Sequence, residues 1–317
     1  MTDSVKFDKA WAEGVVKKVV KTEAVIKESK CDTIAQGKGF LSEIYRITLV
    51  WDKANPNENL PQGLIVKRPS LQKLQGDGLQ DFSNAVSDDF LRKVETLLKA
   101  IASLQAFGLN NAQWTTKIGK ADDSFMEGII KSRDSAIPAM RETFPNDFKL
   151  TDSQVDDLIV KVKANMVKSS DPAAHGYLPV LVYGDLQPNN ILWKIDPSNG
   201  ETTDEIGALV DFQVVHRGLP YEDVACILFM HMGPQERRKN EDRLLKVYYD
   251  TLCNKSTKPI TFSLTDLKTG YRMLLATYIY MCTGMIRPYL SMMPDDANLR
   301  KEIIDKLNAG YEDCGVC

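Results

Sequence analysis

The sequence predicts an α+β fold with two lobes: a small lobe that contains a β-hairpin, and a larger lobe that is mainly helical. Its 317 residues are enough for two lobes, each with a core of its own. Residues 44–51 and 63–67 are rich in β-branched and aromatic side chains and flank a polar turn, which is typical of a hairpin. Residues 220–312 are expected to be mainly helical. We expect the lobes to cover residues 1–107 and 108–317.

The first lobe is expected to begin with a helix over residues 5–29, where valine and aromatic positions recur among lysines. The hairpin follows it. Ser87 is then a suitable N-cap for a further helix, with Asp88 and Asp89 in its first turn and Gly108 as its end.

The second lobe opens with a helix at Thr151, where Thr-x-x-Gln resembles a capping box. Residues 180–183 then form a strand that leads into a loop. Residues 191–195 and 206–210 are predicted to pair as a second hairpin around a polar turn.

The composition excludes several classes of function. The chain is 43% hydrophobic and 26% charged, with a formal net charge of −3. Nucleic-acid-binding surfaces usually show a basic excess, so no nucleic acid partner is expected. The N-terminus has no apolar signal region, and the most apolar stretch, 273–285, is shorter than the roughly 20 residues needed to span a bilayer. We therefore expect no membrane association and a cytoplasmic location.

The strongest chemical signal is a loop with the sequence Tyr-Gly-Asp-Leu-Gln-Pro-Asn-Asn at 183–190, followed by Val-Asp-Phe at 210–212. An acidic residue after a strand, here Asp185, can orient or deprotonate a hydroxyl nucleophile. Asn190 and Asp211 offer the oxygen ligands that Mg²⁺ requires. The intervening hairpin should return Asp211 beside the loop. Phosphoryl transfer needs this combination of groups.

These residues resemble the catalytic and metal-binding loops of the protein-kinase superfamily. The wording Gly-Asp-Leu-Gln-Pro-Asn-Asn with Val-Asp-Phe-Gln is most similar to the CHK-kinase-like and ecdysteroid-kinase-like group, and in particular to its uncharacterised nematode members. The resemblance implies the bilobal, protein-kinase-like fold of aminoglycoside and choline kinases. It also implies that 218–225 supplies an Asp-x-Ala segment, with Asp223 packed under the catalytic loop.

The N-terminal half gives weaker support for the same resemblance. Gly37, Gly39 and Ser42 precede a strand, and such a turn lets main-chain N–H groups approach phosphate closely. Lys67 ends a strand in the way of a nucleotide-binding lysine. A plain β-turn and a solvated strand-end lysine are the alternatives. We favour the binding roles because both features precede the stronger motif in the expected order.

The sequence departs from the family pattern at Tyr183, at Gln187, where the family often has Trp, and after Lys67. Tyr183 stands where the family has His, and it is expected to hold the loop in its place. An active kinase also pairs Lys67 with a Glu on a following helix, but no Glu occurs between Glu58 and Glu95. We interpret this as a deletion that leaves the small β lobe incomplete. The alternative makes Glu95 the partner of Lys67 and needs strands from residue 114 onward.

Other polar residues are less informative. His216 and Arg217 follow Asp211 and either contact phosphate or substrate or lie on the loop surface, and the sequence leaves both alternatives open. His231 is expected to be a packed helix residue. The mixed charges of 236–243 indicate a solvated helix face.

The function expected from the resemblance is ATP-dependent phosphorylation of a hydroxyl group on a small metabolite. Asp185 would be catalytic, Asn190 and Asp211 would hold Mg²⁺, and Gly37, Gly39, Ser42 and Lys67 would bind the nucleotide. The expected partner is a small-molecule hydroxyl acceptor, with no protein partner. A catalytically impaired pseudokinase or truncated isoform, acting as a binding or regulatory protein, is the alternative.

Overall fold

The computed structural model describes residues 7–20, 22–35, 42–52, 60–69, 88–119, 136–169, 172–292 and 297–314. The chain forms two compact units, Met1–Leu79 and Gln80–Cys317, and each is described by itself. Both contain helices and antiparallel strands, so the α+β prediction is confirmed.

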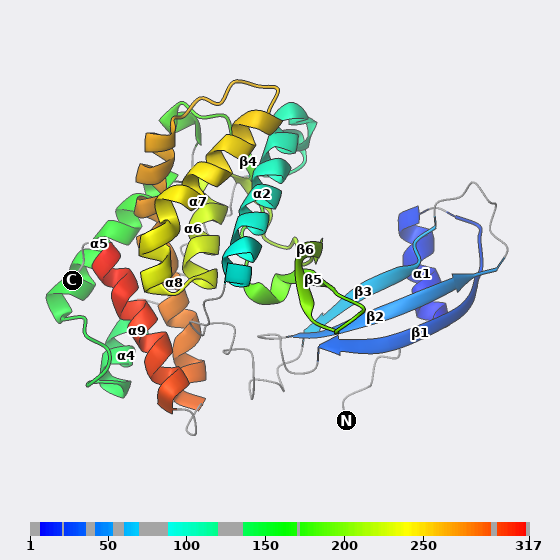
Figure 1. The fold of residues 1–317 in the computed structure, drawn as a ribbon, viewed down its shortest axis with the longest axis horizontal. Coiled ribbons are helices and arrows are strands. Elements are labelled where there is room, and N and C mark those ends of the chain that lie inside the picture. Colours follow the sequence, from blue (N-terminus) through cyan, green and yellow to red (C-terminus); the bar gives the residue numbers. More distant parts are fainter. Residues whose placement is uncertain are drawn as a thin grey trace. The chain divides into compact units, whose positions relative to one another are not determined.

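In its described residues the first unit is a three-stranded antiparallel sheet covered by one helix (Figure 1). It consists of α1 (Lys9–Val20), β1 (Ile26–Ala35), β2 (Ser42–Trp51) and β3 (Gly63–Pro69), with the strands in the order β1-β2-β3. In β2 the side chains of Ile47 and Leu49 are buried, whereas those of Thr48 and Val50 are exposed. This period of two places a single apolar face against α1, and the core is formed by Ala12, Val16, Ile26, Ile47 and Leu49.

The predicted hairpin is confirmed by the pairing of β2 with β3, but the predicted helix over 5–29 is wrong beyond Val20. The Thr22 hydroxyl accepts a hydrogen bond from the main-chain N–H of Ala24 at 3.0 Å, and such local bonds compete with helix. Ile26 is then fully buried and pairs with Trp51 in the sheet. Tertiary pairing therefore overrides the local helical pattern after residue 22.

The second unit is mainly helical and contains two short antiparallel sheets, β4-β7 and β5-β6. Its longer elements are α2 (Asp88–Asn110), α4 (Ala136–Thr143), α5 (Asp152–Ser169), β4 (Val180–Val182), β5 (Ile191–Ile195), β6 (Thr202–Leu209), β7 (His216–Gly218), α6 (Tyr221–His231), α7 (Pro234–Lys255), α8 (Leu264–Met292) and α9 (Ala297–Asp313). The described part of this unit also contains three short 3₁₀ turns, Ala112–Thr116, Pro172–His175 and Pro188–Asn190. The sequence predicted neither α4 nor β7. None of the helices in the described ranges is long and apolar enough to cross a bilayer.

Helix α2 packs within the second unit, whereas the sequence placed it in the first lobe. Its buried face includes Leu97, Leu98 and Ile101, and it lies beside α7 in Figure 1. Its Glu95 forms an ion pair with Arg243 of α7. The structure thus gives Glu95 a different partner from the one that the alternative register requires. Residues 112–116, where the first of the strands needed by that register would begin, form a 3₁₀ turn.

The predicted capping box at the start of α5 is confirmed. The side-chain oxygen of Gln154 accepts the Thr151 N–H at 2.7 Å, and the Thr151 hydroxyl faces the Gln154 N–H at 3.4 Å. Each residue thereby satisfies a main-chain donor that the helix itself leaves without an acceptor.

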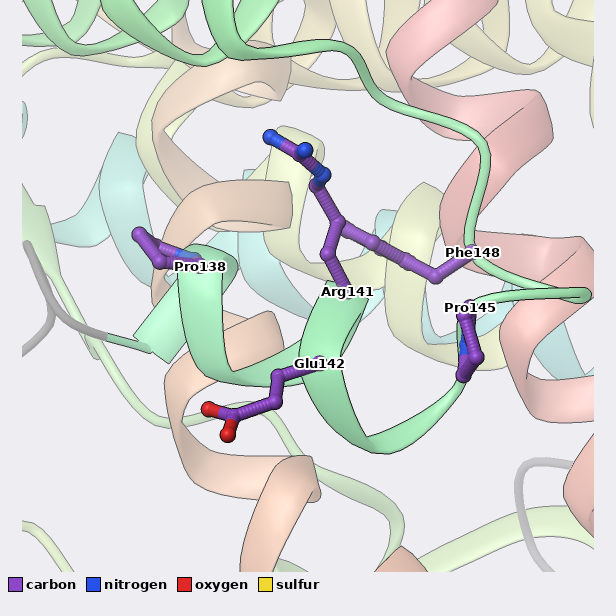
Figure 2. Close-up of a pocket in the computed structure, with 5 residues that line it drawn as sticks. All are labelled: Pro138, Arg141, Glu142, Pro145 and Phe148. Carbon is purple, nitrogen blue, oxygen red and sulfur yellow. The ribbon is translucent and has the colours of Figure 1, made fainter.

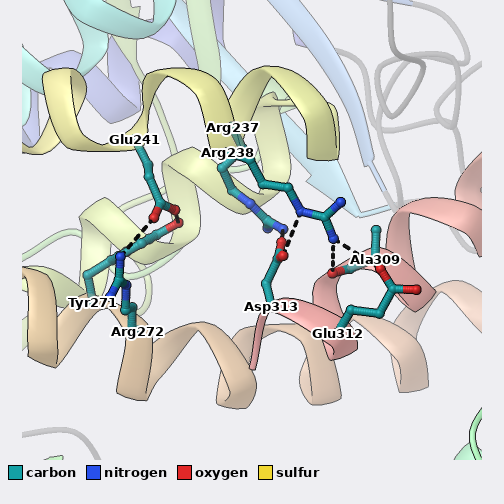
Figure 3. A network of polar contacts seen from close by, with 8 residues as sticks. All are labelled: Arg237, Arg238, Glu241, Tyr271, Arg272, Ala309, Glu312 and Asp313. Carbon is teal, nitrogen blue, oxygen red and sulfur yellow. Dashed lines mark hydrogen bonds and ion pairs between the residues drawn. The ribbon is translucent and has the colours of Figure 1, made fainter. Parts of the chain in front are cut away.

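The expectation that 236–243 is a solvated helix face is wrong for Arg237. The Arg237 side chain is 2% exposed and pairs with Asp313 of α9. Figure 3 shows Arg238 reaching the other oxygen of Asp313, at 2.6 Å, while Glu241 meets Tyr271 and Arg272 of α8. The charges that suggested a solvent-facing helix therefore join α7 to α8 and α9.

Candidate active site

The loop between β4 and β5 holds Asp185 in a defined orientation. Asn190 is fully buried, and its Nδ2 donates to the main-chain oxygen of Asp185 at 2.7 Å and to Asp185 Oδ2 at 2.8 Å. Gln187 Nε2 reaches the same carboxylate oxygen at 3.1 Å. Because both hydrogens of the Asn190 amide are used on Asp185, its Oδ1 points away from that residue.

The β5–β6 hairpin returns Asp211 to this loop, as the sequence predicted. Ile191 pairs with Leu209, and the main-chain N–H of Val210 donates to the oxygen of Asn190 at 3.0 Å. Asp211 comes next and has φ 72°; among the described residues it is the sole non-glycine residue with positive φ. Such a conformation is unfavourable for an aspartate and tends to be kept where a site needs it.

Tyr183 joins the two segments that carry Asp185 and Asp211. Its hydroxyl donates to the main-chain oxygen of Val210, and its ring meets that of Phe212 edge-on with centroids 4.9 Å apart. Burial raises the pKa of Tyr183 strongly, and the charges of Asp185 and Asp211 raise it further. The side chain therefore remains a neutral donor, in the holding role expected for the residue that replaces the family's His.

Asp223 of α6 supports the start of the loop from beneath. Its carboxylate accepts the main-chain N–H of Tyr183 at 2.9 Å and that of Gly184 at 2.9 Å. Burial raises the pKa of Asp223 to about 6, although these two hydrogen bonds favour the charged form. The predicted packing of the Asp-x-Ala segment under the loop is confirmed.

Two further residues of this support were missed by the sequence analysis. Gln105 of α2 donates to Asp223 Oδ2 at 3.2 Å, and its own oxygen accepts the hydroxyl of Tyr248 of α7. Both residues are fully buried. The available signal was a glutamine on the apolar face of an amphipathic helix, which requires a buried polar partner.

The three remaining polar candidates have structural partners. His216 Nδ1 lies 2.8 Å from the main-chain oxygen of Val214, and its Nε2 lies 3.0 Å from Glu222 Oε2. Arg217 pairs with Leu181 across the β4-β7 sheet. His231 is confirmed as a packed helix residue, because its Nε2 lies 2.7 Å from the Leu186 main-chain oxygen. Burial lowers the pKa of His231 to about 4.

The predicted nucleotide-binding residues belong to the first part of the chain. Gly37 and Gly39 lie outside the described residues. Ser42 and Lys67 belong to the first unit, where they pair with Pro69 and Ile44 between β2 and β3. Their roles in nucleotide binding stay predictions.

The donor set of the loop and hairpin fits Mg²⁺. Asn190 and Asp211 supply one amide oxygen and one carboxylate, and Mg²⁺ prefers oxygen ligands completed by water and substrate phosphate. Within the part of the chain that the structure describes, no three His, Cys, Asp or Glu side chains gather as a metal cluster. The set suits a metal ion that arrives with a phosphate ligand better than a closed structural site.

A separate pocket of about 360 Å³ lies beside α4 and includes none of these residues. It is lined by Pro138, Arg141, Glu142, Pro145 and Phe148 (Figure 2). The figure shows the side chains of Arg141 and Glu142 extending away from each other, so their charges do not converge on one point.

Curated relatives of this chain are nematode proteins. An uncharacterized kinase-like protein, D1044.1 of Caenorhabditis elegans, is 29% identical over 231 residues, which is 67% of this chain and 56% of that protein. The uncharacterized oxidoreductase dhs-27 of the same organism is 23% identical over 245 residues, 73% of this chain and 29% of that protein. The chain thus spans about half of one relative and under a third of the other.

Solved structures with a similar arrangement are phosphotransferases. A putative aminoglycoside phosphotransferase from Ralstonia eutropha is 13% identical, with coverage of 98% and 99% of the two chains and a TM-score of 0.49. The ADP-bound aminoglycoside phosphotransferase APH(2'')-Ib is 14% identical, with coverage of 97% and 99% and a TM-score of 0.38.

A family model, DUF1679, described as "Uncharacterized oxidoreductase dhs-27", matches residues 12–89 and 80–315. Together the two segments include most of the first unit and nearly all of the second. The predicted relationship to an uncharacterised nematode group with kinase-like members is confirmed. The chain belongs to the DUF1679 family.

Proposed function

We propose that the chain is a phosphotransferase that uses ATP and Mg²⁺ to phosphorylate a hydroxyl group of a small molecule. The observation that carries the proposal is the Asn190 side chain. It fixes Asp185 through two hydrogen bonds, and the main-chain oxygen of Asn190 accepts the N–H of Val210, the residue before Asp211. One buried residue thus couples a candidate base to a candidate metal ligand, as phosphoryl transfer requires.

In the proposed reaction Asp185 orients the acceptor hydroxyl and takes its proton as the oxygen bonds to the γ-phosphorus. The bond between that phosphorus and the bridging oxygen of ATP breaks, and ADP leaves with the electron pair. Asn190 Oδ1 and the Asp211 carboxylate would hold Mg²⁺, which neutralises charge on the phosphates. Gly37, Gly39, Ser42 and Lys67 would bind the nucleotide.

The fold favours this activity over the oxidoreductase name of a relative. Nicotinamide cofactors bind in the Rossmann fold at the carboxyl ends of parallel strands. All strand pairs in the described parts of both units are antiparallel. This chain also aligns with only 29% of the relative that is named an oxidoreductase, so most of that relative has no counterpart in the alignment.

Three further expectations are part of this proposal. The acceptor is taken to be a small molecule, the location to be cytoplasmic, and a segment to be missing after Lys67.

The test is thermal unfolding with ADP or ATP, with and without Mg²⁺, on the wild type, Asp211→Asn and Asp185→Ala. A ligand at 100 times its Kd adds about 2.7 kcal/mol of stability, so binding is readily detected. We expect a magnesium-dependent rise in Tm that Asp211→Asn loses and Asp185→Ala retains. Slow ADP release from ATP should be lost in both variants. Asp242→Asn, an exposed carboxylate paired with Lys268, is the control.

The outcomes separate the two functions. No magnesium-dependent shift, or the same shift in Asp211→Asn, would overturn the proposed metal site. A shift without any ADP release from the wild type would favour a binding or regulatory protein that has kept the loop but not the chemistry.

A further inference from the structure

His216 in β7 lies between two hydrogen-bond acceptors. Its Nδ1 faces the main-chain oxygen of Val214 at 2.8 Å, and its Nε2 faces the Glu222 carboxylate at 3.0 Å. The His216 and Glu222 side chains are 15% and 17% exposed, so water replaces neither contact easily. A carbonyl and a carboxylate oxygen can only accept, so both ring nitrogens must donate. The geometry therefore requires an imidazolium, because a neutral ring has one N–H.

The two acceptors belong to the two segments that build the candidate site. Val214 lies in the segment that follows Asp211, and its oxygen would be 2.9 Å from a Cβ added to Gly184. Glu222 lies in the first turn of α6, where its other oxygen accepts the Leu219 N–H at 2.5 Å. The carboxylate of the next residue, Asp223, accepts the main-chain N–H of Gly184 and so holds the loop that carries Asp185. His216 thus connects the segment of one functional aspartate to the anchor of the other.

The charges around the ring favour its protonated form. Burial disfavours the imidazolium, but the hydrogen bond and the charge of Glu222 outweigh it, and the pKa of His216 is raised. The Val214 oxygen and Asp223 act in the same direction. The opposing strand contributes Val182, which carries no charge, and the catalytic loop contributes Gly184. The positive charge of His216 is therefore balanced by two carboxylates of α6, those of Glu222 and Asp223.

We infer that His216 is a positioning residue whose imidazolium clamps the segment after Asp211 to the start of α6, and that loss of its proton loosens the site. The inference rests on the proposed phosphotransferase function for its effect on turnover. When His216 is neutral, one ring nitrogen has no hydrogen and its lone pair faces an acceptor oxygen. The hydrogen bond to either Val214 or Glu222 is then lost. Activity should then fall on the alkaline side as His216 loses its proton.

The experiment measures the pH profile of magnesium-dependent ATP hydrolysis together with the imidazole NMR signals. The chain has three histidines, so His216 is assigned by the signal lost in His216→Gln. Glu222→Gln keeps an oxygen for Leu219 but removes the charge that favours the imidazolium. We expect it to move both the His216 titration and the alkaline limb of kcat to lower pH. Glu205→Gln, on the exposed face of β6, and His175→Gln are the matched controls.

His216→Gln should lose the alkaline limb itself and lower kcat on the order of 100-fold, since small misplacements of reacting groups have effects of that size. An unchanged alkaline limb in Glu222→Gln, with a normal fold by circular dichroism, would overturn the inference. So would a His216 signal that titrates at the same pH in both proteins.

Failure of the proposed function gives a different pattern. If no protein hydrolyses ATP, the clamp is judged by the main-chain amide signals of Gly184 and Val214. If the chemical shifts of these two amides change with pH at the same midpoint as the His216 ring, and that midpoint moves in Glu222→Gln, the positioning role is supported in a non-catalytic protein. Amide signals that do not follow the titration contradict it.

Discussion

The Asp223 carboxylate accepts the main-chain N–H of Gly184 at 2.9 Å while its other oxygen accepts that of Tyr183. A fully buried side chain on α6 thus fixes the main chain one residue before Asp185. The position of the candidate base is therefore set from below by a residue that need not touch substrate.

Asp223→Asn should destabilise the second unit and disturb the loop. The amide retains one acceptor oxygen but turns an NH₂ group toward a main-chain N–H, so two donors meet in a buried place. A buried donor left without an acceptor costs about 1–3 kcal/mol, which chemical denaturation can measure. The exposed Asp242→Asn substitution should change stability little. Equal stability of Asp223→Asn and wild type would contradict the anchoring role.

Gly184→Ala should be more harmful than Gly200→Ala, although both glycines have positive φ. The values are 87° at Gly184 and 78° at Gly200, so the conformational strain is comparable. A Cβ at Gly200 meets nothing within 4 Å, but at Gly184 it lies 2.9 Å from the Val214 oxygen. We expect a loss of roughly 1 kcal/mol at Gly200 and roughly 3 kcal/mol at Gly184.

Urea unfolding of both variants separates the cost of backbone strain, which the two sites share, from the cost of the steric contact at Gly184. If the two losses are the same, the close approach of Val214 to the loop is wrong. The nucleotide-dependent Tm shift should also be reduced in Gly184→Ala alone.

The candidate site loop and its hairpin were predictable because they are local in sequence. Asp185, Asn190 and Asp211 are joined by one short hairpin, and turn residues with β-branched strands specify that hairpin without help from elsewhere. The supports of the loop come from distant segments. Gln105 reaches Asp223 from α2, and Tyr248 of α7 in turn donates to Gln105. Spacing along the chain carries no information about such contacts.

The errors in the fold have the same origin. Residues 22–29 show a helical pattern, yet Ile26 pairs with Trp51 in the sheet, and only tertiary structure decides between the two. Arg237 looked like part of a solvated charge run. Its partner Asp313 is at the end of α9, so its burial could not be inferred from neighbours in α7.

Asp313→Asn should destabilise the protein more than Arg237→Met. The first leaves the buried Arg237 guanidinium without its anion, and breaking a buried pair in this way costs about 3–5 kcal/mol. The second removes the buried cation, while Asp313 keeps Arg238 at 2.6 Å. Methionine also fills much of the space of the arginine stem.

Denaturant unfolding of both variants checks this order. The control is Asp250→Asn, whose exposed pair with Lys246 one helical turn away is worth about 0.3–0.5 kcal/mol. A larger loss for Arg237→Met than for Asp313→Asn would show that packing of the arginine, and not its charge, determines the stability of this contact.

His231 should make the protein sensitive to acid. Burial lowers its pKa from 6.5 to about 4, and the nearby Lys306 opposes a second positive charge. The unfolded chain therefore binds a proton near pH 6.5 that the folded protein binds only near pH 4. Stability is fully present above pH 6.5 and falls as pH decreases through this window, by about 3 kcal/mol between pH 7 and pH 4.

His231→Gln tests this directly, because a glutamine amide can still donate to the Leu186 oxygen but takes up no proton. The free energy of unfolding of the variant should change less between pH 7 and pH 4 than that of the wild type. The difference between the two proteins separates the contribution of His231 from that of the carboxyl groups that titrate in the same range. His175→Gln serves as the control and should follow the wild type. Parallel curves for His231→Gln and wild type would mean that His231 takes up its proton in the folded state. In that case a protonated ring would still donate to Leu186, and acid would leave the position of the loop just after Asp185 unchanged.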